Sequence, residues 1–154
     1  LTAKVENRVN HRTFALLLAA SIACGVDFGV YRSRGPAKVF FISGSHFESD
    51  WQRLKLLQTH DQLSQARPLL EKNLTFYHHE HEADPLVDLR HTSTQVAMRK
   101  TMPDGVAVVI IASVPAFMHP KLGKLGPITP YQWFSELNAE GIAVVAFDLL
   151  RPRE

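Results

Sequence analysis

The chain has 154 residues, a formal net charge of +2, and charged side chains of both signs spread along its length. It lacks the basic stripe interleaved with aromatic residues that marks a nucleic-acid interface, so we expect no nucleic-acid partner. Its one cysteine, Cys24, excludes an intrachain disulfide, a Cys-x-x-Cys redox pair and a zinc–thiolate cluster.

The N-terminal segment carries the strongest hydropathy signal. Residues 13–31 are apolar, have basic residues at both ends, and are about 20 residues long, the length that spans a bilayer. We therefore predict a transmembrane helix over 13–31, an extension over 1–12 before it and a linker over 32–36 after it. Two alternatives stay open: an uncleaved secretory or lipoprotein signal, and a helix buried in a soluble protein.

Asp27 is the only carboxylate of that segment. A charged carboxylate near the centre of a bilayer costs about 2–3 kcal/mol on insertion scales, so we expect it to have a partner. Arg32 of the same chain, at the level of the lipid headgroups, is the default partner, and a cation of a neighbouring subunit is the alternative. Asp27 and Arg32 are therefore the predicted membrane or partner residues.

The first elements after the linker are predicted from their residue types and from the proline, glycine and capping residues at their ends. Residues 37–43 are rich in β-branched and aromatic side chains between Pro36 and Gly44, which predicts a buried strand. Ser49 and Gln52 have the spacing of a capping box, so we expect a helix to begin at Ser49.

The middle of the chain continues the alternation. Residues 74–82 predict a second strand with a polar end, and residues 84–100 predict a helical stretch. Residues 106–114 are an almost continuous run of Val, Ile and Ala, which is typical of a strand buried on both faces. Residues 121–126 predict a short return strand that adds an antiparallel pairing.

The last helix has the clearest start and stop signals. Thr129 is predicted as its N-cap, Pro130 as its first residue, and Gln132 completes a capping box. Gly141 supplies the C-terminal stop. A final strand over 142–150 follows, so the whole order predicts an α/β fold with helices covering a sheet.

This order resembles the thioredoxin fold. Residues 39–43 with 50–54 are similar to its first strand and helix, 102–111 to its proline-preceded strand, and 121–126 with 129–137 to its last hairpin strand and closing helix. More narrowly, the chain resembles a thioredoxin-like family of unknown function that lacks the redox cysteines.

The resemblance covers residues 37–141 and implies a mixed sheet with flanking helices in a domain over residues 37–154. It does not imply redox activity, because the loop 44–49 that follows the first strand contains no cysteine, and thiol–disulfide exchange needs a thiolate.

A histidine cluster is the candidate metal site. Imidazole and carboxylate groups bind divalent metals, and His78, His79 and His81 lie close together in the sequence. On a strand, His79 and His81 share one face and His78 points to the other, so a third ligand must come from elsewhere. The alternative is a polar strand end at the surface.

We predict no catalytic and no cofactor-binding residue. The loop 45–50 brings together Ser, His and acidic residues, as nucleophilic catalysis requires, but the helix cap at Ser49 explains the same pattern.

The leading functional hypothesis is a non-catalytic, membrane-anchored accessory or structural subunit of a larger membrane complex of respiratory or ATP synthase type. Its partners are other subunits and the lipid bilayer. Because the chain begins with Leu1, we expect import into an organelle and single-pass insertion in the mitochondrial inner membrane. The alternative is an anchored or secreted thioredoxin-like enzyme or metal-binding protein of the bacterial envelope.

Overall fold

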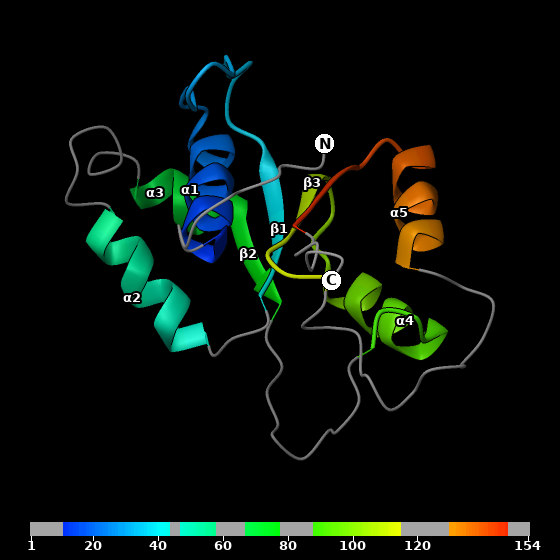
Figure 1. Ribbon diagram of the computed structural model, residues 1–154. Coiled ribbons are helices and arrows are strands. Elements are labelled where there is room, and N and C mark those ends of the chain that lie inside the picture. The colour runs from blue at the N-terminus through cyan, green and yellow to red at the C-terminus, as the bar shows by residue number, and fades with distance from the viewer. Residues whose placement is uncertain (1–10, 44–46, 58–66, 78–87, 115–129, 148–154) are drawn as a thin grey trace, which may run out of the picture.

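The computed structural model describes residues 11–43, 47–57, 67–77, 88–114 and 130–147, with the backbone alone at 47–49 and 56–57. These residues form an α/β structure with a sheet between two layers of helices (Figure 1). In chain order the elements are α1 (His11–Cys24), β1 (Lys38–Ile42), α2 (Phe47–Leu57), α3 (Arg67–Asn73), β2 (Leu74–Tyr77), α4 (Thr92–Thr101), β3 (Val106–Ile111), α5 (Pro130–Ala139) and β4 (Ala143–Ala146).

The four described strands form one sheet in the order β2-β1-β3-β4, and every neighbouring pair is parallel. In register, Ile42 of β1 lies beside Tyr77 of β2 and Ile111 of β3. The predicted α/β class with flanking helices is confirmed. The antiparallel strand predicted over 121–126 lies outside the described residues.

Alternation along the strands divides the core into two layers. Val39 and Phe41 of β1 face α1, α2 and α3, whereas Phe40 and Ile42 face α4 and α5. All four side chains are fully buried, which explains why β1 reads as a continuous apolar run. Helices therefore cover both apolar faces of the sheet.

The helix α1 ends earlier than the apolar segment does. Gly25 has φ +71°, its amide donates to Ile22 O, and the next amide, of Val26, donates to Ser21 O at 2.9 Å. This Schellman pattern stops the helix after Cys24, so the helix covers 14 residues where the sequence predicted one through residue 31. Among the helices of the described ranges, none is long and apolar enough to cross a membrane.

The same helix packs on the sheet. Leu16, Ala19 and Ala20 are fully buried in the layer that β1 and α3 share. At the last turn of α1, the buried side-chain amide of Asn73 donates from Nδ2 to Ala23 O at 2.8 Å. The helix is thus tied to the junction of α3 and β2 by both apolar contacts and a buried hydrogen bond.

One predicted helix start in the first half of the chain is wrong. The helix α2 begins at Phe47, so Ser49 lies in its first turn and not at its cap. A separate helix, α3, begins at Arg67 because Pro68 fits the first turn, where its missing N–H is not needed.

The second half follows the prediction more closely. The helix α4 covers only the last part of the predicted stretch 84–100, and β3 begins at Val106 as expected. Pro130 is the first residue of α5, and its amphipathic face buries Trp133, Phe134 and Leu137. Thr129 lies outside the described residues.

The stop of α5 is a second Schellman motif. Gly141 has φ +84°, and Ile142 N donates to Leu137 O at 3.0 Å. Ile142 and Leu137 also share one apolar cluster, the hydrophobic contact that accompanies this motif. The turn leads directly into β4, which confirms a strand after Gly141.

Candidate functional site

The carboxyl ends of all four strands lie along one edge of the sheet, because every described strand pair is parallel. Ser43 follows β1 and is buried, and Ser113 follows β3 and is half-buried. Backbone bonds continue the sheet here, since Ala112 N donates to Ile42 O at 3.0 Å and Val114 N donates to Phe147 O at 2.9 Å. We name this region the carboxyl edge.

The connections change direction at the carboxyl edge. From β1 the chain passes through α2 and α3, on one face, to β2; from β2 it passes through α4, on the other face, to β3. The helix that follows β1, α2, and the helix that follows β3, α5, therefore lie on opposite faces of the sheet. In open α/β sheets ligands bind at such a switch point, and Ser43 and Ser113 follow the two neighbouring strands here.

An ion pair lies in the segment that precedes α4. The carboxylate of Asp88 is fully buried and accepts hydrogen bonds from Arg90 Nη2 at 2.6 Å, from Nε at 2.9 and 3.1 Å, and from the Arg90 amide at 2.9 Å. The side-chain hydrogen bonds to Asp88 raise the pKa of the Arg90 guanidinium, and 19% of the Arg90 side-chain surface is exposed. This bidentate ion pair holds the Arg90 guanidinium in a fixed position just before α4.

A buried amide holds the same segment from the other side. Gln95, in the second turn of α4, donates its Nε2 to Leu89 O at 2.7 Å, and His91 N donates to Asp88 O at 2.9 Å. Residues 88–91 are therefore held by contacts with their own helix. Because α4 leads through a short turn into the amino end of β3, its first turn lies toward the carboxyl edge.

The helices that flank the switch point direct their N-termini toward the same edge. The helix α2 follows β1 directly, and α4 and α5 each end beside the amino end of the next strand. The first turns of α4 and α5 contain no acidic residue, and the N-cap residue His91 makes no side-chain capping bond. Helix dipoles directed this way place positive potential at this edge.

A second buried carboxylate belongs to the other face. Asp50 lies in the first turn of α2, is fully buried, and has its Oδ1 3.9 Å from Arg53 Nη1. Asp50 and Asp88 therefore place one acidic side chain beside each face of the sheet. Asp50 lies at the start of α2, which follows β1, and Asp88 lies just before α4, the helix that precedes β3.

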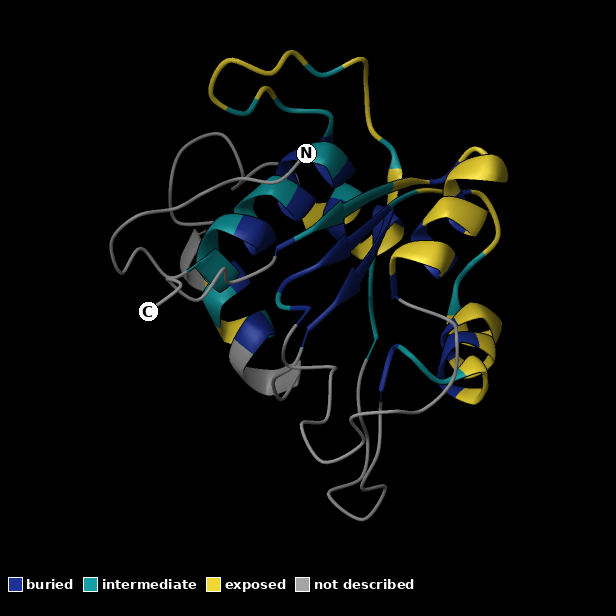
Figure 2. Cartoon of the chain, turned by 45° about the vertical axis from the view of Figure 1, so that its right-hand side comes forward, coloured by how far each residue is buried: buried dark blue, intermediate teal, exposed yellow. Residues whose placement is uncertain are grey.

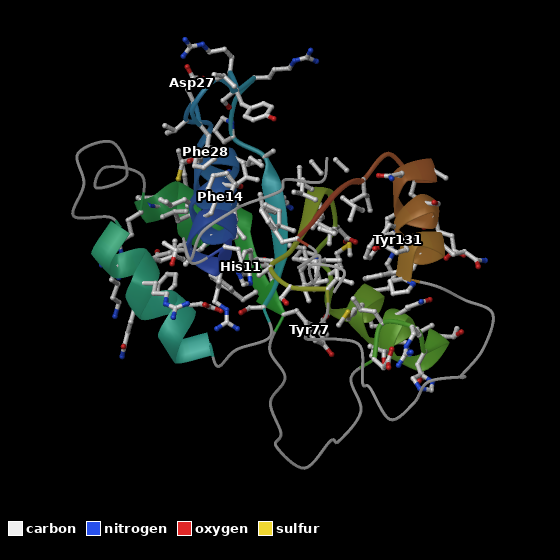
Figure 3. All side chains as sticks on the ribbon, in the orientation of Figure 1. His11, Phe14, Asp27, Phe28, Tyr77 and Tyr131 are labelled. Carbon is white, nitrogen blue, oxygen red and sulfur yellow. The ribbon has the colours of Figure 1, made fainter. Side chains whose placement is uncertain are left out.

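The predicted partner residues lie at the opposite edge. Arg32 Nη1 donates to Asp27 Oδ2 at 2.6 Å, and Ser33 N donates to Asp27 Oδ1 at 2.8 Å. The Ser33 amide, followed by Arg32, lowers the pKa of the Asp27 carboxyl. Asp27 is at the tip of the loop between α1 and β1 in Figure 3, far from the carboxyl edge.

The predicted metal ligands His78, His79 and His81 lie outside the described residues. Within the part of the chain that is described, no three His, Cys, Asp or Glu side chains are grouped so as to hold a metal ion. The histidine cluster therefore stays a prediction from the sequence.

The Asp88–Arg90 pair was missed by the sequence reasoning. The predicted helical stretch 84–100 placed both residues inside a helix, whereas α4 begins at Thr92. The run Thr92–Thr94, whose side chains favour helix starts over helix interiors, was the available signal for the later start. No protein-family model matches the chain, and a search of curated proteins gives no match to it.

Proposed function

We propose that the chain is a ligand-binding α/β domain that holds a small anionic molecule at the carboxyl edge. The observation that carries the proposal is the strand order β2-β1-β3-β4 with all pairs parallel, which creates a switch point between β1 and β3. Ligands of doubly wound sheets bind at such a point because the diverging loops leave a crevice there. Ser43 and Ser113 follow these two strands at the carboxyl edge.

The charge of the ligand is argued from the α4 and α5 side of this edge, because α2 carries Asp50 in its first turn. Helix N-termini favour phosphate or carboxylate groups, and the first turns of α4 and α5 carry no acidic side chain that would compete. Arg90 adds a guanidinium whose orientation Asp88 fixes. A preorganised guanidinium loses less side-chain entropy on binding than a free one.

Calorimetric titration with pyrophosphate and with ATP tests the proposal. A charge-assisted hydrogen bond contributes about 1.5–3 kcal/mol, so replacing Asp88 and Arg90 together with Asn and Gln weakens binding about tenfold or more. The double substitution removes both charges and leaves no buried carboxylate alone. Arg99→Gln is the matched control, because Arg99 lies in the last turn of α4 and pairs with Glu140.

Two results contradict this function. One is the absence of binding of either polyanion at millimolar concentration by the intact chain. The other is equal affinity in the double variant and in the parent, since the anion would then bind elsewhere.

A second candidate is the accessory or structural subunit of a larger membrane complex, in the mitochondrial inner membrane. The observation that favours it is α1, which is apolar around its circumference: half-buried Phe14, Leu17, Leu18 and Ile22 complete the ring begun by its buried residues. Such a surface suits contact with another subunit or with lipid. Native electrophoresis in mild detergent tests it, because migration only as the free chain contradicts a subunit role.

We also propose that the complete sheet has the mixed, thioredoxin-like form. The proposal needs residues 121–126 to pair antiparallel with an edge strand, β2 or β4, because β1 and β3 already have a strand on each side. Cross-strand nuclear Overhauser contacts between these residues and a sheet strand support it, and their absence from a fully assigned spectrum contradicts it.

A further inference from the structure

The loop between α1 and β1 projects from the amino edge of the sheet. Figure 2 shows residues 25–36 as a largely exposed extension beyond the helices and strands. We name residues 26–35 the projecting loop. Its base is narrow, because a Cβ on Gly25 would lie 2.5 Å from Pro36 N, and Ala37 N donates to Ile22 O at 3.1 Å.

Internal contacts give the projecting loop a defined shape. Phe28 and Tyr31 exchange two backbone hydrogen bonds of 3.0 Å, which close a tight turn. The Asp27 carboxylate accepts hydrogen bonds from Ser33 and Arg32 on the returning side. The ring of Phe28 contacts the ring of Phe14 on α1, with centroids 5.1 Å apart, so the turn is anchored to the body (Figure 3).

The turn over residues 28–31, which we name the apolar tip, carries large apolar side chains that face water. Val30 is 88% exposed and Tyr31 is 55% exposed. Among the described residues the other large exposed apolar side chains are Val96 and Tyr131, which stand singly on α4 and α5. Two neighbouring exposed apolar side chains on a braced projection are an unusual use of surface, because burial elsewhere would lower the free energy.

Arginine flanks this apolar tip. The side chain of Arg32 keeps 79% of its surface exposed although it pairs with Asp27, and Arg34 is exposed as well. With Asp27 as its one acidic residue, the projecting loop has a net positive charge. An aliphatic and an aromatic side chain beside two arginines match the layered chemistry of a bilayer surface, with acyl chains below and anionic headgroups above.

We infer that the projecting loop binds the surface of an anionic lipid bilayer, with Val30 and Tyr31 inserted at the headgroup level and Arg32 and Arg34 against phosphate groups. A protein partner fits less well, because a standard interface buries about 800 Å² on each side and two side chains at a narrow tip provide much less. This inference rests on neither the anion site at the carboxyl edge nor a membrane-spanning helix.

Co-sedimentation of the full chain with vesicles tests the inference. We expect binding to vesicles that contain one-third phosphatidylglycerol and at least fivefold weaker binding to vesicles of phosphatidylcholine alone. Added salt weakens the binding, because it screens the arginines. Equal binding to both kinds of vesicle, or none to the anionic kind, overturns the inference.

A matched pair of double variants locates the contact. V30D/Y31S removes the apolar tip, and V96D/Y131S makes the same changes at the exposed sites on α4 and α5. The first lowers the bound fraction at least fivefold and the second leaves it unchanged. Equal binding by the two variants overturns the inference.

A reporter variant keeps the test independent of how well the tip variant folds. Y31W places an indole at the tip, and its emission, taken as the difference from the parent, shifts to shorter wavelength on addition of anionic vesicles. Brominated lipids quench it. A Y31W difference emission that anionic vesicles leave unchanged overturns the inference.

Discussion

Asp88 holds Arg90 in a two-pronged ion pair, with the Nη2 to Oδ2 distance at 2.6 Å and the carboxylate fully buried. The pair lies immediately before α4, on the side of the sheet where the parallel strands end. A guanidinium in a fixed position at a helix start is suited to recognising an anion, which links this contact to the proposed function.

The pair also contributes to stability. Replacing Arg90 alone by Gln leaves the buried Asp88 carboxylate without its cation, and such a loss costs about 3–5 kcal/mol of unfolding free energy. The double variant D88N/R90Q recovers part of this loss. Urea unfolding followed by circular dichroism measures the three values, with Arg67→Gln as a control whose exposed pair with Glu71 contributes less than about 1 kcal/mol. An Arg90→Gln effect as small as that of the control contradicts the buried pair.

The helix α1 is predicted to stabilise the sheet that it covers. Leu16 is fully buried, so Leu16→Ala lowers the unfolding free energy by about 2–5 kcal/mol. The neighbouring Leu17 is half-buried, and Leu17→Ala has a clearly smaller effect. Chemical denaturation of both variants measures the difference. Equal effects at the two positions would argue against the packing of α1 on the sheet.

Alanine substitutions at Gly25 and Gly29 are expected to lower the stability of the fold by different amounts. Gly25 and Gly29 have φ +71° and +57°, so alanine at either position costs about 1–2 kcal/mol in backbone strain. A Cβ at Gly29 meets nothing within 4 Å, whereas at Gly25 it meets Pro36. Gly25→Ala therefore lowers the melting temperature more than Gly29→Ala does, and the reverse order would contradict the close approach.

The ionisation of the Asp27 carboxyl sets the pH range over which its hydrogen bonds stabilise the projecting loop. Hydrogen bonds from Ser33 and then Arg32 lower its pKa below the ordinary value of 3.8, so the stabilisation is complete above that value. It is lost as the pH falls through the lowered pKa. A carbon-detected NMR titration gives a midpoint below 3.8, and Arg32→Gln raises the midpoint only in part because the Ser33 amide remains. A midpoint at or above 3.8 in the parent excludes these bonds.

Local signals made part of the fold predictable. Pro130 and Gly141 act through their own backbone angles, which is why the bounds of α5 followed from the sequence. The strands β1 and β3 followed from their runs of buried apolar residues. Nothing in these patterns states which strands are neighbours, so the order β2-β1-β3-β4 came only from the structure.

Long-range contacts set the features that were not predicted. The apolar character of residues 13–31 is continuous, yet the helix stops where Gly25 meets Pro36, a residue eleven positions later. The bond between Asn73 and Ala23 joins residues 50 positions apart. The candidate site was missed for the same reason, since the carboxyl edge exists only after the strands have paired. The pairing of Asp27 with Arg32, which is local, was predicted.

The most direct test of the carboxyl-edge site is a two-dimensional amide NMR titration of the chain with pyrophosphate. We predict that the largest shifts cluster at Ser43, at residues 88–95 and at residues 112–114, while the projecting loop is unaffected. Shifts confined to other surfaces, or no shift at millimolar pyrophosphate, would contradict the proposal that this edge of the parallel sheet binds an anion.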